Sequence, residues 1–278
     1  MKKLLAVSIF SAFSASTYAG DLTQWMVDMS SNNSAVILNK GAVFGDSNTY
    51  IKLVIHRVTI GSYAPPKFNG DPLFQARSRE AYDAGIYFGA YHVAYPSTDA
   101  ISQAKGFLSA VSEQCIAQQK IILAVDWEHV CSKWKVAGKK KICSAEQIVQ
   151  PSFINAFVKE VISITGVTPI IYTSPRTLRE FTSYFHSNED AREFLSSMPL
   201  WIARYRSPTG HVFPTDGEMY PWNDWVFWQF AEGKGAGPTK RVSLKIGNEP
   251  VDTNYYNGER TEIEGFYAKH AWTCKRPG

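Results

Sequence analysis

Short apolar runs alternate with longer amphipathic stretches along most of the chain. Several of the runs are almost continuously apolar, which is typical of strands that are buried on both faces of a sheet. Each run is therefore expected to form a β-strand. The expected strands are 24–29, 52–58, 86–93, 120–127, 168–173, 199–205 and 225–230, with a short last strand near 250–254.

The stretches between these strands carry the signals of helices. The expected helices cover 72–84, 99–113, a stretch that ends at Gly166 and a stretch after Pro175. The third has the clearest start, because Ser144 and Gln147 match a capping box and an apolar stripe follows them. Glycines placed after the first and third helices are suited to end them.

Repeated alternation of strand and helix over about 250 residues predicts an α/β protein with a parallel sheet. Seven or eight strands favour a TIM-like (β/α) barrel that lacks helices on one side. A doubly wound open sheet is the alternative, but the chain has neither a GxGxxG nor a GxxxxGK[ST] phosphate-binding loop. No linker rich in Pro, Gly or Ser divides the sequence.

The N-terminal segment MKKLLAVSIFSAFSASTYAG predicts a secretory signal peptide over residues 1–19. It has a basic start, an apolar core too short to span a bilayer comfortably, and small residues before a cleavage point after Ala19. An uncleaved membrane anchor is the alternative. No later stretch is long and apolar enough to insert stably into a membrane. We therefore expect an exported protein, periplasmic or secreted, with one domain over 20–278.

Charge and cysteine content narrow the picture further. The formal net charge of +4 falls to +2 when Lys2 and Lys3 are removed, and this weak balance does not indicate nucleic acid binding. The basic run at 135–143 is expected to be a solvated loop. Four cysteines in an exported chain favour two disulfides. Three pairings are possible; Cys131 with Cys143 across the loop is preferred, which leaves Cys115 with Cys274 and would tether a C-terminal tail, about 266–278.

Polar and aromatic residues gather where the expected strands end. In (β/α) barrels the chemistry lies at the carboxyl ends of the strands, so these residues are the candidates for a site. They are Asp28, His56, Arg57, Tyr91, His92, Asp126, Glu128, Tyr172, Thr173, Arg204, Tyr205, Trp228, Gln229, Asp252 and Asn254.

Asp126 and Glu128 are the most informative pair. Because strand side chains alternate, both point to one side of the sheet, and Trp127 points to the other. Burial and mutual repulsion raise the pKa of such carboxyls, so that one can carry a proton near neutral pH and another can stay ionised. Hydrolysis of a glycosidic bond requires this division between an acid and a negative partner.

Each candidate also has a purely structural interpretation. Asp126 and Glu128 can be loop acids satisfied by lysines or backbone N–H groups, and Asp28 can cap a turn in the segment DMSSNN. His92 can be a hydrogen-bonded core histidine. The aromatic residues and the glutamine can be packing residues with one hydrogen bond each; they are Tyr91, Tyr172, Tyr205, Trp228 and Gln229.

Seven segments share their order and spacing with one enzyme family: VDMSSNN, AYDAGIYFGAYHV, LAVDWE, PIIYTS, LWIARY, WVFWQF and VDTNYYNG. They resemble strands of the family-25 glycoside hydrolases, the Chalaropsis-type lysozymes, which are N-acetylmuramidases. The first resembles the DVSxxN motif of that family, the second its AGxxxGxYHF motif, and the third its Asp-x-Glu strand. Each match is loose alone, but seven in order over nearly the whole mature chain are specific.

The resemblance implies a flattened, helix-deficient (β/α) barrel and roles for the matching residues. Glu128 would be the catalytic acid. Asp126 would be a nucleophile or would orient the N-acetyl group of the substrate, and Asp28 and Asp252 would hold the geometry and charge of the site. No metal and no cofactor are implied. The residues expected to bind substrate are Tyr91, His92, Tyr172, Tyr205, Trp228 and Gln229.

The chain departs from the family pattern in two places. Ile60 stands where the family often has a glutamate, and residues 131–143 resemble an insertion that could overhang the groove and present a basic face to wall polymer. We expect no wall-binding repeat beside the domain.

The resemblance implies a secreted muramidase that hydrolyses the β-1,4 bond between N-acetylmuramic acid and N-acetylglucosamine. Peptidoglycan glycan strands are thus the expected partner. The alternatives are a non-catalytic glycan-binding protein on a glycosidase scaffold, a chitinase-like glycosidase, and a metal-dependent hydrolase that uses the same acids. An antibacterial role would also involve an immunity or delivery partner, which one sequence does not reveal.

Overall fold

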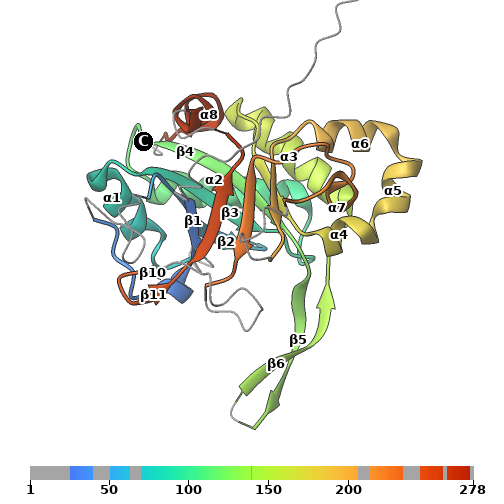
Figure 1. Ribbon diagram of the computed structural model, residues 1–278, viewed down its shortest axis with the longest axis horizontal. Coiled ribbons are helices and arrows are strands. Elements are labelled where there is room, and N and C mark those ends of the chain that lie inside the picture. Colours follow the sequence, from blue (N-terminus) through green and yellow to red (C-terminus); the bar gives the residue numbers. More distant parts are fainter. Residues whose placement is uncertain are drawn as a thin grey trace, which may run out of the picture.

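The computed structural model describes residues 26–39, 51–62, 70–138, 140–205, 213–233, 245–258 and 262–275. The expected signal peptide, 1–19, lies outside the described residues, so its assignment stays a prediction. The described residues form a barrel of strands, helices packed around it, and a two-stranded arm that extends away from the barrel (Figure 1).

Eight strands close into the barrel. Each strand pairs with its neighbours in the order β1, β2, β3, β4, β7, β8, β9, β12, and β12 pairs back with β1. This ring confirms the predicted (β/α) barrel. The bounds are β1 (Met26–Met29), β2 (Leu53–Ile60), β3 (Tyr87–Val93), β4 (Lys120–Trp127), β7 (Ile170–Thr173), β8 (Leu200–Ala203), β9 (Phe227–Ala231) and β12 (Asp252–Tyr256).

The direction of β12 differs from the all-parallel sheet that the sequence predicts. β12 runs antiparallel to both β1 and β9, whereas the other barrel strands are parallel to their neighbours. The first residue of β12, rather than its last, therefore lies at the rim where the parallel strands end. As a result Asp252 is the register partner of Asp28.

Side-chain alternation along the strands divides the core into two layers. The inner layer fills the barrel and includes Met26, Leu53, Ile55, Ile122, Ala124, Ile170, Trp201 and Phe227. The outer layer lies between the barrel and the helices and includes Val27, Val54, Phe88, Leu123, Trp127, Ile171, Ile202 and Trp228. The strands are buried on both faces, which explains their nearly continuous apolar sequences.

Helices of very different length surround the barrel. They are α1 (Phe74–Ala84), α2 (Ala100–Gln114), α3 (Pro151–Thr165), α4 (Pro175–Glu180), α5 (Thr182–Ser187), α6 (Glu189–Ser196), α7 (Asp216–Met219) and α8 (Glu262–His270), with a 3-10 turn, η1, at Ser31–Asn33. Gly85 and Gly166 end α1 and α3 in the left-handed conformation, as predicted.

The start predicted for α3 is wrong. Ser144 and Gln147 do not form a capping box but belong to a strand, β6 (Lys140–Gln147), whose backbone groups pair with the neighbouring strand. The helix begins at Pro151 instead, because the fixed φ and missing N–H of proline suit the first turn of a helix. The apolar stripe was correctly assigned to a helix; only its beginning was misplaced.

The C-terminal segment closes the barrel at the end opposite to the strand carboxyl ends. Ile263 and Tyr267 of α8 join the inner layer, and the Tyr267 hydroxyl hydrogen-bonds backbone groups of Phe88 and Lys120 at the beginnings of β3 and β4. β13 (Ala271–Thr273) then pairs with β4. The disulfide between Cys115 and Cys274, predicted by elimination, joins the end of α2 to this segment.

The run predicted as a solvated loop is a β-hairpin. β5 (Val130–Ala137) and β6 pair antiparallel, and the predicted disulfide between Cys131 and Cys143 links them with a Cα–Cα distance of 5.6 Å. The expected insertion, 131–143, thus lies within a longer two-stranded arm formed by β5 and β6. A second small hairpin consists of β10 (Lys245–Ile246) and β11 (Glu249–Pro250).

The two disulfides should differ in their contribution to stability. Cys115 and Cys274 are separated by 159 positions and Cys131 and Cys143 by 12, and a longer loop removes more entropy from the unfolded chain. We expect a double serine variant at Cys115 and Cys274 to lose about 4–5 kcal/mol of unfolding free energy, measured by urea denaturation. The matched variant at Cys131 and Cys143 should lose less; an equal or greater loss would contradict this prediction.

Candidate active site

A cavity of about 190 Å³ opens at the rim where the parallel strands end. Its position is the one that the sequence predicts for a site in a (β/α) barrel. Most of its lining side chains are polar. They are Asp28, Tyr91, Asp126, Glu128, Tyr172, Trp201, Tyr205, Gln229, Glu232 and Asp252.

Side-chain alternation places Asp126 and Glu128 in the cavity together. Asp126 continues the inward row of Ile122 and Ala124 along β4, and Glu128 follows one residue after the strand ends. Trp127 points outward, where it stacks on Phe181 and donates its indole N–H to a backbone carbonyl. The Asp-x-Glu sequence thus anchors one residue in the outer core and directs both acids inward.

The Asp28 carboxylate is held by amide donors from two neighbouring strands. Its Oδ2 accepts hydrogen bonds from Gln229 Nε2 and Asn254 Nδ2, each at 2.8 Å. Burial raises the pKa of Asp28 to about 6, and the two amide hydrogen bonds act in the opposite direction. Because both donors favour the ionised form, Asp28 is the member of the cluster best suited to carry a negative charge.

Hydroxyl and indole donors fix the orientation of those two amides. The Oε1 of Gln229 accepts hydrogen bonds from the hydroxyls of Tyr172 and Tyr205, at 2.9 and 3.0 Å. The Oδ1 of Asn254 accepts one from Trp201 Nε1 at 2.7 Å. With both oxygens occupied as acceptors, both amide nitrogens are directed at Asp28.

Asp252 faces Asp28 across the β1–β12 pair. Burial is the main cause of its raised pKa, followed by the charge of Asp28. The two side chains hydrogen-bond each other, and the interaction lowers the pKa of Asp28 while raising that of Asp252. Asp252 is accordingly the protonated partner of the pair, and its Oδ1 also accepts the backbone N–H of Gly233 at 2.5 Å.

The pKa values of Asp126 and Glu128 are also raised. Burial is the largest cause for both; the charge of Glu128 adds to it at Asp126, and that of Glu232 adds to it at Glu128. The pKa of Glu128 rises to about 7, which leaves it largely protonated in mildly acidic solution. The Asp126 Oδ1 is buried without a hydrogen-bond partner among the described residues. It is therefore available to a substrate group.

Two predicted binding residues lie outside the cavity. His92 is fully buried in the outer layer, where it stacks on Phe157 and hydrogen-bonds Thr59 and Gln103. Trp228 is buried as well and donates its indole N–H to the Arg204 carbonyl. Each follows or precedes an inward residue on its strand, so alternation turns it outward. The expectation that these two side chains line the groove is corrected by their position.

The other predicted binding residues line the cavity: Tyr91, Tyr172, Tyr205 and Gln229. Two lining residues were missed. Glu232 is the first residue after β9, so the rule of strand ends could have found it. Trp201 lies in the inward row of β8, where an aromatic residue cannot be distinguished from core by sequence. Ile60, the departure from the family pattern, is exposed at the end of β2 and is not among the lining residues.

Arg57 lies near the cluster without lining the cavity. Its guanidinium pairs with the buried carboxylate of Asp71 at 2.8 Å and donates to the Ser31 hydroxyl at 3.1 Å. Its positive charge lowers the pKa of Asp126, against the larger effect of burial. In the part of the chain that the structure describes, no group of three or more His, Cys, Asp or Glu side chains is arranged to hold a metal ion.

Comparisons with known proteins agree on one family. The model of the glycosyl hydrolases family 25 matches residues 27–237. The N,O-diacetylmuramidase of Arthroderma benhamiae is 30% identical over 178 residues, which are 64% of this chain and 63% of that protein. Protein YegX of Escherichia coli O6:H1, whose function is uncharacterised, is 27% identical over 196 residues, which are 70% of this chain and 57% of that protein. The chain thus spans less than two thirds of these curated relatives.

A solved structure shares the fold. The bacterial lysozyme from Streptomyces coelicolor superposes with a TM-score of 0.56 at 20% identity, over 85% of this chain and 93% of the other. The family match includes the strands that carry Asp28, Asp126 and Gln229, and it covers well over half of the sequence. The chain belongs to the glycosyl hydrolases of family 25.

Proposed function

We propose that this protein is a muramidase that hydrolyses the β-1,4 bond between N-acetylmuramic acid and N-acetylglucosamine in peptidoglycan. The observation that carries the proposal is the division of the cavity carboxyls: Glu128, with a pKa raised to about 7, beside Asp28, which two amides hold in its ionised form. Glycoside hydrolysis uses one protonated and one ionised carboxyl group in this way. The name of the Arthroderma relative supports the choice of substrate.

In the proposed mechanism Glu128 donates its proton to the oxygen of the leaving sugar. The positive charge that develops on the other sugar is stabilised by the ionised carboxylates of the cavity, chiefly Asp28. Water then adds to the anomeric carbon of that sugar and gives its proton to Glu128, whose burial favours the protonated form. The rings of Tyr91 and Tyr205, which line the cavity and are not buried, offer surfaces to the sugars.

Asp126 has two possible roles, and one measurement separates them. In its ionised form Asp126 can attack the anomeric carbon through its unpartnered Oδ1, which breaks the bond to the oxygen that Glu128 protonates. Alternatively, it can hold the substrate N-acetyl group so that the acetyl oxygen attacks that carbon. The first route forms a covalent glycosyl-enzyme and the second does not. Mass spectrometry of the intact protein, quenched during turnover of a slow substrate, distinguishes them.

Export to an oxidising compartment is part of the proposal. It is supported by the two disulfides, which persist outside the cytosol, and by the signal-like sequence at 1–19. None of the helices in the described ranges has the length and apolar character needed to cross a bilayer.

Replacement of Glu128 by glutamine should abolish cleavage while the protein still folds. Loss of the general acid is expected to lower turnover by at least about 100-fold. The measurement is digestion of purified peptidoglycan, with the products reduced and identified by mass spectrometry. Glu264→Gln, at the closed end of the barrel on α8, is the matched control and should cleave like the unmodified protein.

The products decide between this proposal and its alternatives. New reducing ends on N-acetylmuramic acid support a muramidase, whereas reducing ends on N-acetylglucosamine would replace it with another glycosidase activity. Cleavage of chitin oligosaccharides in preference to peptidoglycan would indicate a chitinase-like enzyme. Folded, disulfide-intact protein that cleaves none of these glycans would favour a glycan-binding protein.

The alkaline limb of the pH–activity profile should lie near pH 7 and should depend on Glu232. An acid catalyst is active below its pKa, so kcat/KM on a soluble glycan fragment is expected to fall as the pH rises through about 7. Glu232→Gln removes a negative neighbour and should move this limb to lower pH. An unchanged limb in that variant, or a shift equally large in Glu264→Gln, would argue against the assignment.

The same pKa shift should make stability depend on pH. Glu128 titrates near 4.5 in the unfolded chain and near 7 in the native protein, so its contribution is complete below 4.5 and is lost as the pH rises through 7. Chemical denaturation at pH 5 and pH 8 should show lower stability at pH 8. In Glu128→Gln this difference should be smaller by about 2–3 kcal/mol. An equal pH dependence in both proteins would refute the prediction.

A further inference from the structure

The hairpin of β5 and β6 begins directly beside the catalytic cluster. β5 starts at Val130, two positions after Glu128, and the hairpin extends away from the body of the domain (Figure 1). Eight strand residues span about 26 Å at the usual rise per residue. The arm therefore reaches well beyond the cavity, from the same rim.

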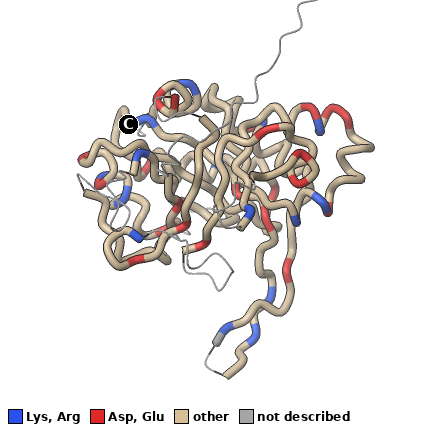
Figure 2. Tube along the Cα trace, in the orientation of Figure 1, with Lys and Arg blue, Asp and Glu red and all other residues tan. Residues whose placement is uncertain are grey.

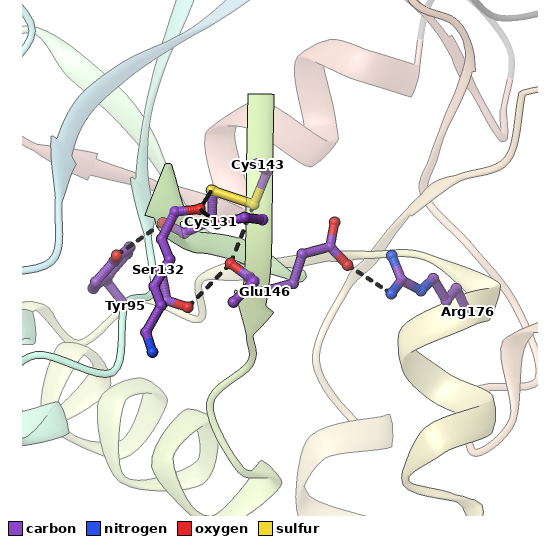
Figure 3. Close-up of a disulfide and its surroundings, with 9 residues drawn as sticks. Tyr95, Cys131, Ser132, Cys143, Glu146 and Arg176 are labelled. Carbon is purple, nitrogen blue, oxygen red and sulfur yellow. Dashed lines mark hydrogen bonds and ion pairs between the residues drawn. A yellow bond between two sulfur atoms is a disulfide. The ribbon is translucent and has the colours of Figure 1, made fainter. Parts of the chain in front are cut away.

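The base of the arm is fixed to the domain (Figure 3). The disulfide between Cys131 and Cys143 joins its strands, and the Tyr95 hydroxyl, from the segment after β3, donates to the Cys131 carbonyl at 3.0 Å. On the other strand, Glu146 pairs with Arg176 of α4 at 2.7 Å. These contacts give the arm a defined direction relative to the cavity, because both strands are tied to the barrel surroundings.

The arm exposes apolar side chains that belong to neither layer of the core. Trp134 is 62% exposed, Val136 73% and Ile142 38%. Trp134 and Val136 are two positions apart on β5 and share one face, on which Lys141 is the register partner of Val136. Lys135 and Ile142 are paired on the opposite face. Each face thus presents apolar surface next to a positive charge.

The charged residues of the arm are almost all positive. Residues 130–147 include five lysines and a single acid, Glu146, which is occupied by Arg176 at the base. Lys133, Lys135 and Lys141 are exposed. Basic positions lie on the arm in Figure 2. A rigid strand pair with an exposed indole and unbalanced positive charge matches an anionic polymer that also has apolar surface.

We propose that the arm binds peptidoglycan alongside the strand that enters the cavity, and so holds the enzyme on its polymeric substrate. The proposal rests on the proposed function, because it takes the occupant of the cavity to be peptidoglycan. Sugar rings offer apolar faces to Trp134, and the carboxylates of the peptide stems offer partners to the lysines. Continuity with the cavity favours this occupant, since one polymer can contact both.

The distribution of residues along the arm disfavours a membrane. A hairpin that inserts into lipid needs its apolar residues at the end and its cations behind them. Here the two kinds of residue alternate along the strands instead: Lys141 lies level with Val136 and closer to the turn at Gly138 than Trp134 does. A polymer lying along the strands contacts both kinds of residue without burying a lysine.

Co-sedimentation with insoluble peptidoglycan sacculi tests the binding directly. All proteins carry Glu128→Gln, so that the sacculi are not digested during the measurement. Adding Trp134→Ala should raise the half-saturating protein concentration about five- to thirtyfold, the range expected for loss of a central aromatic contact. The matched control is Tyr82→Ala on α1, an aromatic residue that is 54% exposed away from the arm. It should bind like the parent protein.

A variant with fewer positive charges tests the contribution of the lysines on the arm. Lys133→Ser, Lys135→Ser and Lys141→Ser combined should weaken binding and reduce its dependence on salt concentration, since exposed charges are screened by ions. Circular dichroism and the retained Cys131–Cys143 disulfide verify that the arm persists in this variant. Binding as tight and as salt-sensitive as that of the parent would overturn the proposal.

Activity assays separate failure of this inference from failure of the proposed function. In proteins that keep Glu128, Trp134→Ala should lower the rate on sacculi relative to the rate on soluble disaccharide-peptide fragments. An unchanged ratio, together with unchanged binding, would overturn the proposal that the arm binds peptidoglycan. The proposed muramidase activity would still stand. Absence of cleavage by every variant would overturn the proposed muramidase activity. The co-sedimentation measurements would still show whether the arm binds peptidoglycan.

Lipid vesicles test the alternative that the arm binds a membrane. Co-sedimentation is repeated with vesicles of phosphatidylethanolamine and phosphatidylglycerol. Binding to these vesicles that is lost in Trp134→Ala, with binding to sacculi unaffected, would assign the arm to a membrane and overturn the proposal. Weak vesicle binding that does not depend on Trp134 agrees with a peptidoglycan-binding arm.

Discussion

The site depends on the two amide hydrogen bonds that hold the Asp28 carboxylate where β1 pairs with β12. Gln229 and Asn254 come from β9 and β12, and their oxygens are occupied by tyrosine hydroxyls and an indole, so neither amide can turn away. The remaining acids are arranged around this charge. Asp252 holds a proton toward it, and its field helps to raise the pKa of Asp126. The reversed direction of β12 makes this possible, because it delivers Asp252 to the rim with its first residue.

Burial of the cavity carboxyl groups costs folding free energy, which the rest of the fold must offset. Several carboxyl groups with raised pKa values share one cavity, and burial is the largest cause of every shift. The two apolar layers, the α8 segment that closes the far end of the barrel and the disulfide to Cys274 supply rigidity around it. A looser barrel would admit water and return the acids toward their ordinary pKa values. Stability and the capacity to donate a proton near neutral pH are thus coupled through the same buried groups.

The arm is stabilised by different interactions from those of the barrel. Its apolar residues are exposed and its charges are unbalanced, so its conformation depends on strand pairing, one disulfide and contacts at its base rather than on a core. Such a segment adds little to the stability of the barrel. Its position next to Glu128 connects it to the site, and its surface suits an extended polymer better than a small ligand.

The sequence by itself determined the barrel and the convergence of Asp28, Asp126, Glu128 and Asp252, because strand periodicity and the position of strand ends are local properties. It favoured the two disulfide pairs among three possible pairings, and the structure decided between them. Alternation also implied that Tyr91 and His92 could not both face the cavity, although both were expected to line it. Only the tertiary structure decided the direction of β12, the strand character of Ser144 and Gln147, and the inclusion of Trp201 in the cavity lining. Each of these depends on which segments pair, in the barrel for β12 and Trp201 and in the arm for Ser144 and Gln147, and the choice of a pairing partner leaves no mark in the local pattern.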